Sequence, residues 1–130
     1  MRIFWGFAIG MIIAFLCLLG VEAIGQSLFP VPHGIDPLDP AGQARRIEAM
    51  SASARAVVPV GWFVASLVGG WVGNRIAGRA LPGWAISLII LGAGVFNMFG
   101  YPHPIAMWIA AIVLPLLAAC LAQWVAKVPV

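Results

Sequence analysis

Charged side chains are scarce in this sequence. Only 8% of its 130 residues are Asp, Glu, Lys or Arg, whereas 63% are hydrophobic. A soluble domain of this length cannot bury so much apolar surface and still present a wettable exterior. The formal charge of +3 is too small and too dispersed for nucleic acid, which requires a concentrated basic face. The composition therefore excludes a nucleic-acid partner and favours a lipid bilayer as the surroundings of the chain.

Cysteine is scarce too, with two residues in the chain. Cys17 and Cys120 each lie inside a long apolar run. If these runs are helices that cross a bilayer in opposite directions, the two depths differ by on the order of 10 Å at about 1.5 Å of rise per residue. A disulfide requires Cα atoms within roughly 7 Å of each other. We therefore interpret both cysteines as small buried apolar residues.

Long apolar runs dominate what is present. A helix that spans a bilayer requires about 20 predominantly apolar residues. Four segments meet this requirement: residues 3–25, 57–77, 82–99 and 104–128. The sequence thus predicts an all-α integral membrane bundle of four transmembrane helices, a single domain over residues 1–130 with no room for a soluble catalytic domain. Short links make the last three spans antiparallel neighbours.

The longest polar segment, residues 26–56, is expected to join the first two spans. Its first half is rich in proline, which excludes a regular helix and indicates a stiff loop. We expect residues 29–40 to fold over the helix ends with their apolar side chains, including Leu38, covered. Asp39 suits an N-cap and Pro40 a first helical position, so a short helix on the membrane surface should follow. Pro59 is expected in the first turn of the second span.

Small residues recur at four-residue spacing within the predicted spans. Such spacing places small side chains on one helix face and allows another helix to approach closely. The first span has one such row, and the second span has two adjacent rows. We expect the following residues at helix–helix contacts: Gly6, Gly10, Ser66, Gly69, Gly70 and Gly73.

The distribution of Lys and Arg predicts the orientation of the chain. An even number of spans places both termini on one side, together with Arg2, Arg75, Arg79 and Lys127. The other side has three arginines, all within the longer loop. Because cytoplasmic loops carry the excess of positive residues, we expect both termini in the cytoplasm and residues 26–56 outside.

Several polar residues are predicted at the level where the spans meet the long loop. They are Glu22, His33, Asp36, Asp39, Asn97 and His103. One interpretation is a binding site at the outer interface for a metal, a proton or a polar head group. We favour the other, in which these groups hydrogen-bond to one another and tie the proline-rich loop to the bundle. Glu22 lies near the end of its span, where water can still reach it.

No pattern in the sequence indicates catalysis or a cofactor. Histidine and aspartate are ligands that zinc accepts, but no close ligand spacing is present. Ser66 and Ser87 have no histidine or carboxylate at their predicted depth to act as a base. A proton- or cation-coupled carrier usually requires a carboxylate near the midplane, which these spans lack. We therefore expect neither an enzyme nor a bound metal or cofactor.

Short motifs are spread over most of the chain. They are His33-Gly34-Ile35-Asp36-Pro37 followed by Asp39, then Gly69-Gly70-Trp71, Asn97 and Pro102-His103-Pro104. In these motifs the chain resembles a group of uncharacterised small bacterial inner-membrane proteins. The resemblance implies a four-helix fold in a bacterial inner membrane, and it implies no activity and no site.

Two functional hypotheses follow from these features. The first is a non-enzymatic accessory or structural subunit that packs with other membrane proteins, as a hetero- or homo-oligomer in the bilayer. Small-residue faces, tryptophans and the small polar part agree with it. The second is a small carrier or binding protein for an apolar or lipid-like ligand, which would enter from the outer face.

Overall fold

The protein is an all-helical membrane bundle. The computed structural model describes residues 1–30, 33–34, 36, 38–100 and 102–130. The helices are α1 (Arg2–Leu28), α2 (Pro40–Ala49), α3 (Ala52–Ala77), α4 (Leu81–Gly100) and α5 (Ile105–Ala126). All of them except α2 are long and apolar enough to cross a membrane, and no strand occurs in the described ranges. The predicted fold class, a bundle of four transmembrane helices, is confirmed.

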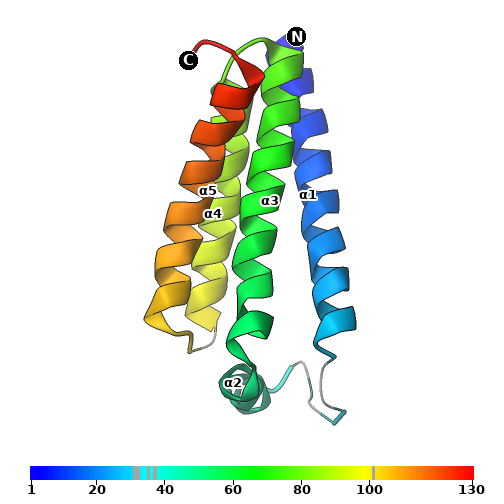
Figure 1. The fold of residues 1–130 in the computed structure, drawn as a ribbon, viewed down its shortest axis with the longest axis vertical. Coiled ribbons are helices and arrows are strands. Elements are labelled where there is room, and N and C mark those ends of the chain that lie inside the picture. Colours follow the sequence, from blue (N-terminus) through cyan, green and yellow to red (C-terminus); the bar gives the residue numbers. More distant parts are fainter. Residues whose placement is uncertain (31–32, 35, 37, 101) are drawn as a thin grey trace.

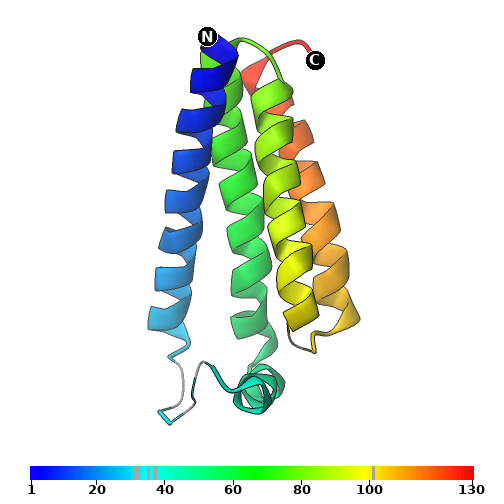
Figure 2. The same ribbon diagram turned by 180° about the vertical axis from the view of Figure 1, so that it is seen from behind.

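The central helix of the bundle is α3, which packs against α1, α4 and α5 (Figures 1 and 2). The smaller contact of α1 is with α4. Both chain termini lie at one end of the bundle, here called the terminus end, together with the α3–α4 turn (Figure 1). The helix α2 and the α4–α5 link lie at the opposite end, here called the loop end.

Helices α1 and α3 touch through their backbones at the terminus end. A Cβ atom placed on Gly6 would lie 2.5 Å from the carbonyl oxygen of Gly73, and one on Gly10 would lie 2.6 Å from that of Gly69. These four residues form what we call the glycine seam, where any side chain would separate the helices. Toward the loop end the nearest atoms to Gly25 belong instead to a valine side chain. The two helices accordingly diverge from the terminus end to the loop end (Figure 1).

The other two residues expected at helix contacts lie on an adjacent face of α3. Gly70 faces both α4 and α5, because a Cβ atom placed on it would lie 3.3 Å from Gly83 Cα and 3.3 Å from Ala122 Cβ. Ser66, one turn away, is fully buried. Gly70 is therefore less tightly enclosed than the glycine seam, and the closest approach in the bundle is between α1 and α3.

The boundaries of α2 and α3 are set by side-chain caps. Asp39 accepts hydrogen bonds from the backbone N–H groups of Ala41 (3.1 Å) and Gly42 (3.0 Å), so α2 begins at Pro40 as predicted. Ser51 accepts one from Ala54 N–H at 3.2 Å, and α3 therefore begins at Ala52. The prediction that Pro59 lies in the first turn of its span is wrong, because this N-cap starts the helix earlier and leaves the proline inside it.

The start of α4 is capped from a neighbouring helix. Fully buried Asn74 of α3 accepts a hydrogen bond through Oδ1 from the backbone N–H of Gly83 at 2.8 Å. The first N–H groups of a helix have no partner within that helix. This bond satisfies one of them in an interior that water does not reach.

Two further bonds tie the terminus end together. Ala80 N–H donates to the carbonyl oxygen of Pro129 at 2.9 Å. Trp84 Nε1–H donates to Gln123 Oε1 at 3.1 Å. These bonds hold the C-terminal segment and α5 against the first turn of α4.

The glycine seam predicts the effect of a single methyl group. Gly10→Ala should lower the free energy of unfolding by about 1–3 kcal/mol through overpacking. The matched control is Gly20→Ala in the same helix, where no atom lies within 4 Å of the added Cβ. The control should retain the parental stability or gain up to about 1 kcal/mol from helix propensity. Titration of the protein in mild detergent with SDS measures both, and equal stability of the two variants would contradict the seam.

The cap on α4 makes a second prediction. Asn74→Ala should lower the free energy of unfolding by about 1–3 kcal/mol, because it leaves the Gly83 N–H buried without an acceptor. The control, Asn97→Ala, removes an exposed amide and should change stability by less than about 0.5 kcal/mol. Thermal unfolding followed by circular dichroism compares the two. If Asn74→Ala melts like the parent protein, the cap contributes nothing.

Candidate functional site

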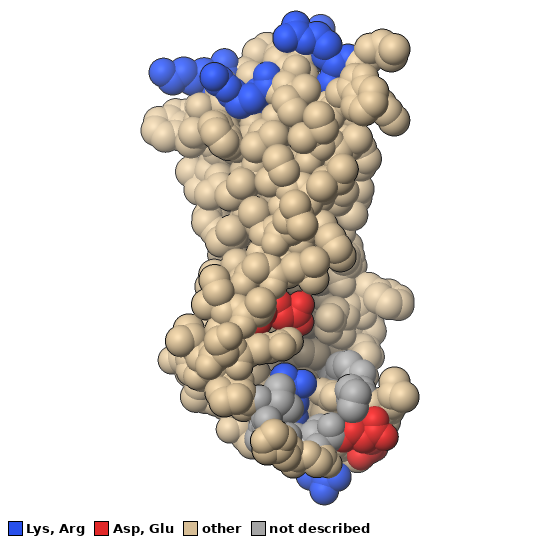
Figure 3. All heavy atoms as spheres, turned by 90° about the vertical axis from the view of Figure 1, so that its right-hand side faces the viewer, with Lys and Arg blue, Asp and Glu red and all other residues tan. Residues whose placement is uncertain are grey.

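The charged atoms of the protein gather at its two ends. Figure 3 shows Lys and Arg side chains at the terminus end, a long uncharged middle region, and a mixture of both signs at the loop end. Acidic atoms also lie recessed in a hollow nearer the loop end (Figure 3). The apolar surface of the middle region is suited to lipid. A polar site is therefore expected at the loop end, where charges of both signs lie.

The first hollow at the loop end lies between α1, α3 and α4. It has a volume of about 160 Å³. Its lining residues are Leu18, Val21, Glu22, Val57, Val58, Gly61, Trp62 and Asn97. Among the described residues of this lining, the carboxylate of Glu22 and the amide of Asn97 are the only ionisable and amide groups, and the other side chains are apolar.

Two further hollows continue the first toward the loop. One of about 70 Å³ shares Glu22, Val57 and Val58 with the first hollow and reaches Arg46 of α2. The next, of about 330 Å³, shares Arg46 with it and extends to Pro30 and Ser51. We call the three adjoining hollows the loop-end groove.

The loop-end groove exists because α1 and α3 diverge beyond the glycine seam. Two glycines line it, Gly25 on α1 and Gly61 on α3, and the side chains of Val57 and Leu18 pack against them from the facing helix. A Cβ atom placed on Gly61 would lie 3.1 Å from Leu18 Cδ1, so a larger residue there would close the first hollow.

Opposite charges border the groove without forming an ion pair. The only ion pair in the described ranges joins Arg45 to Asp39 at 3.9 Å. Within these ranges neither the carboxylate of Glu22 nor the guanidinium of Arg46 has a hydrogen-bond or ion-pair partner. Glu22 is exposed and Arg46 half-buried. Both charged groups therefore remain available to a bound ligand.

The length of α1 explains why a carboxylate is tolerated there. Its 27 residues extend about 40 Å at 1.5 Å per residue, which exceeds a hydrocarbon core of about 30 Å. An excess of about 10 Å placed at the loop end brings the last turns of α1, with Glu22, to the polar head-group region of the membrane. At this level water can still reach the carboxylate.

The six polar residues predicted at this level do not all meet in one place. Glu22 and Asn97 line the same hollow. Asp36 and Asp39 line a different one of about 420 Å³, against α2. The side chains of this second pair are used locally, since Asp36 Oδ1 accepts from Leu38 N–H at 2.8 Å and Asp39 caps α2.

The two histidines lie in separate connections. His33 is exposed in the loop before α2, and His103 is half-buried in the α4–α5 link. Among the residues that the structure describes, no three His, Cys, Asp or Glu side chains are grouped so that they could hold a metal ion. Both cysteines are free, and Cys120 is exposed, so its predicted burial is wrong.

The expectation that the loop covers its apolar side chains is wrong for Leu38, which is 88% exposed. The turn at Asp36 and the N-cap at Asp39 fix the backbone on either side of it. Val31 and Ile35, which were expected to be covered as well, lie outside the described residues.

Arg46 and Trp62 line the groove but were not predicted as site residues. A signal for Arg46 exists in the sequence, because it follows Gly42 by four residues and so shares a helix face with a residue small enough to be buried. Trp62 is only 6% exposed. In the sequence Trp62 cannot be distinguished from the other apolar residues of its span, and only the position of the groove marks it as a lining residue.

Three polar groups lie deeper, in the packing of α3 against α4. Ser66 Oγ, Ser87 Oγ and Asn74 Nδ2 are buried without a hydrogen-bond partner. None of these residues lines the loop-end groove. They belong to the close helix packing and not to the candidate site.

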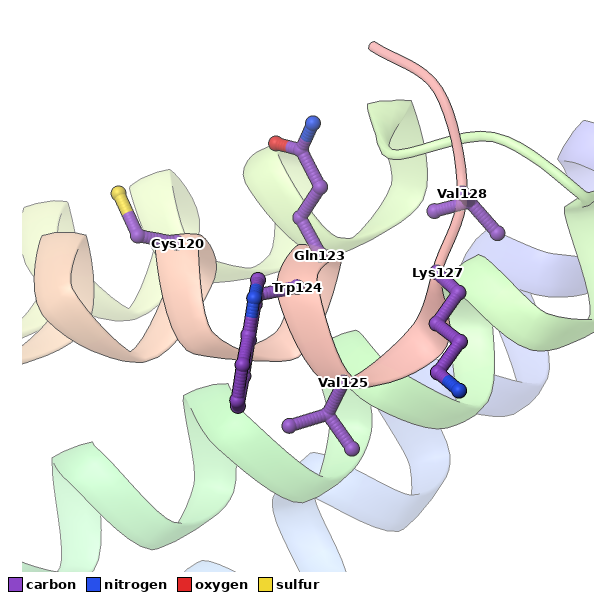
Figure 4. A pocket seen from close by; sticks show the side chains of 6 residues that line it. All are labelled: Cys120, Gln123, Trp124, Val125, Lys127 and Val128. Atoms are coloured by element: carbon purple, nitrogen blue, oxygen red, sulfur yellow. The ribbon is translucent and has the colours of Figure 1, made fainter.

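A larger hollow of about 670 Å³ lies along the end of α5. Its side chains do not converge, since Cys120 and Gln123 point to one side of α5 while Trp124 and Val125 point to the other (Figure 4). Gln123 is also engaged by Trp84. Exposed Trp124 and Lys127 are typical anchors at a membrane interface, so we assign this surface to lipid contact.

No protein-family model, no curated protein and no solved structure matches this chain.

Proposed function

We propose that this multi-pass membrane protein is a non-enzymatic binding protein for a lipid-like amphiphile, which it holds in the loop-end groove. The observation that carries the proposal is a pair of opposite charges, Glu22 and Arg46, which have no partner among the described residues and border a groove with apolar walls. An amphiphile requires this combination, with apolar surface for its tail and polar groups for its head.

The walls of the groove suit a hydrocarbon tail. Leu18 and Val21 of α1 face Val57 and Trp62 of α3 across the first hollow. Removal of apolar surface from water contributes roughly 25 cal/mol per Å². In a bilayer the tail is already out of water, so affinity over bulk lipid has to come from the head group. The charges at the mouth of the groove therefore decide which amphiphile is bound.

An accessory subunit in a larger membrane complex is the second candidate. It is favoured by α1, of whose most apolar segment only 11% is buried, compared with 44% for α3. Gly20 on the open side of α1 has no atom within 4 Å of an added Cβ and would allow another helix to approach. Isolation in mild detergent separates the candidates, because an accessory subunit is recovered with a partner protein and a binding protein with an amphiphile.

We further propose a bacterial inner membrane as the location, with both termini in the cytoplasm. Arg2 and Lys127 flank the terminus end, and Arg75 and Arg79 flank the α3–α4 turn at that same end. Exposed Trp5, Trp71 and Trp124 accompany them. This arrangement of basic residues supports a cytoplasmic terminus end.

The orientation is tested by cysteine labelling in intact cells. In a background of Cys17→Ala and Cys120→Ala, the variant Ser27→Cys should react with a membrane-impermeant maleimide added outside. The variant Gly78→Cys, in the α3–α4 turn, should react only after the cells are opened. The reverse pattern would overturn the proposed orientation.

Filling the groove tests the binding function. Val58 lines it and is 37% exposed, while Val60 on the same helix is 48% exposed and is not among its lining residues. Val58→Trp should weaken binding of single-chain C18 amphiphiles by about tenfold, or 1.4 kcal/mol, whereas Val60→Trp should bind like the parent protein. Native mass spectrometry in mild detergent counts the bound molecules. Equal binding by the two variants would refute a site in the groove.

A further inference from the structure

We infer that the loop-end groove selects a zwitterionic amphiphile whose ammonium group lies between its tail and its anionic group. This inference rests on the proposed function and names the head group that the same groove accepts. It comes from the order in which the charged residues occur along the groove, not from their presence alone.

Glu22 lies deeper in the groove than Arg46. Glu22 lines the hollow that reaches Leu18 and Asn97, and Arg46 lines the hollow that reaches Pro30 and Ser51. Both residues line the small hollow between them. A ligand whose tail enters along α1 and α3 therefore meets the carboxylate first and the guanidinium second.

The deeper end suits a primary ammonium group. The carboxylate of Glu22 and the amide oxygen of Asn97 accept hydrogen bonds, and an ammonium group has three to donate. A quaternary ammonium group has none and is recognised by open aromatic faces instead. Trp62 does not offer such a face, since it is 6% exposed and packs beside Gly94 of α4.

The outer end suits a phosphate or carboxylate. Arg46 presents a planar set of donors that matches such anions. Its neighbour Arg45 is engaged by Asp39 at 3.9 Å and by the carbonyl oxygen of Ala41 at 3.3 Å. Arg46 is therefore the arginine of α2 with free donors at the groove.

The charge order excludes the common glycerophospholipids as preferred ligands. In those lipids the phosphate lies next to the tail and the ammonium group lies beyond it. Such a head group would place its phosphate against Glu22, where like charges repel. A long-chain 2-amino alcohol phosphate has the opposite order and places each charge beside its complement. The groove would thus distinguish its ligand from bulk lipid.

Three probes with C18 chains test the inference with the full chain in mild detergent: sphinganine 1-phosphate, lysophosphatidylethanolamine and octadecyl phosphate. Native mass spectrometry should give at least tenfold tighter binding of sphinganine 1-phosphate than of the other two. If lysophosphatidylethanolamine binds equally well, and Val58→Trp weakens its binding, the charge order is refuted while the groove remains a binding site. If no probe binds in a manner sensitive to Val58→Trp, the proposed function falls as well.

Charge-neutralising variants test which group of the ligand binds at each end of the groove. Glu22→Gln should weaken sphinganine 1-phosphate about tenfold and leave octadecyl phosphate unchanged or tighter. Arg46→Gln should weaken both phosphates. The matched controls, Glu48→Gln and Arg45→Gln, remove the same charges from α2 at positions that do not line the groove and should bind like the parent protein. Equal losses in Glu22→Gln and Glu48→Gln would show that only the overall charge matters, and would overturn the assignment.

Discussion

The backbone contact between α1 and α3 at the glycine seam determines the shape of this protein. Gly6 and Gly10 bring α1 against Gly73 and Gly69 at the terminus end, where backbone meets backbone. Lipid supplies little hydrophobic driving force for helix association, so such close packing is the main attraction available. Because the contact is confined to one end, the other end of α1 is free to diverge, and the divergence creates the loop-end groove.

The same central helix supports the bundle through a different interaction on an adjacent face. There Asn74 of α3 accepts from Gly83 N–H in α4, which replaces a backbone acceptor that a helix start lacks. The two interactions lie near the same end of α3. The terminus end is thereby the closely packed end of the molecule, and the loop end is where α1 and α3 have room between them. A binding site at the loop end is a consequence of where the close contacts are placed.

The spans could be predicted because each requires only a long apolar run, whereas their boundaries depend on single caps. Asp39 was recognised as a cap because Pro40 follows it, but Ser51 was not, and so α3 begins earlier than expected. The candidate site shows the same division. Glu22 and Asn97 share a hollow because their depths agree, which helix rise predicts. The spacing of Gly42 and Arg46 indicates which face of α2 is buried, but the contribution of Arg46 also depends on how α2 lies across the helix ends, which that spacing does not determine.

Asp36 and Asp39 form interactions within their own loop and helix α2. Glu22 and Arg46 are therefore left available in the groove. Asp39 is nearer in sequence to the arginines of α2 than Glu22 is, and it engages Arg45 while it caps the helix. Had Asp39 paired with Arg46 instead, the groove would retain only its carboxylate and would suit a simple cation. Because Arg46 has no partner among the described residues, the groove has both a negative and a positive group, with Glu22 deeper than Arg46. In a bilayer every amphiphile has a tail, so the arrangement of charge in the head group is the property by which a small membrane protein can distinguish a ligand from its solvent.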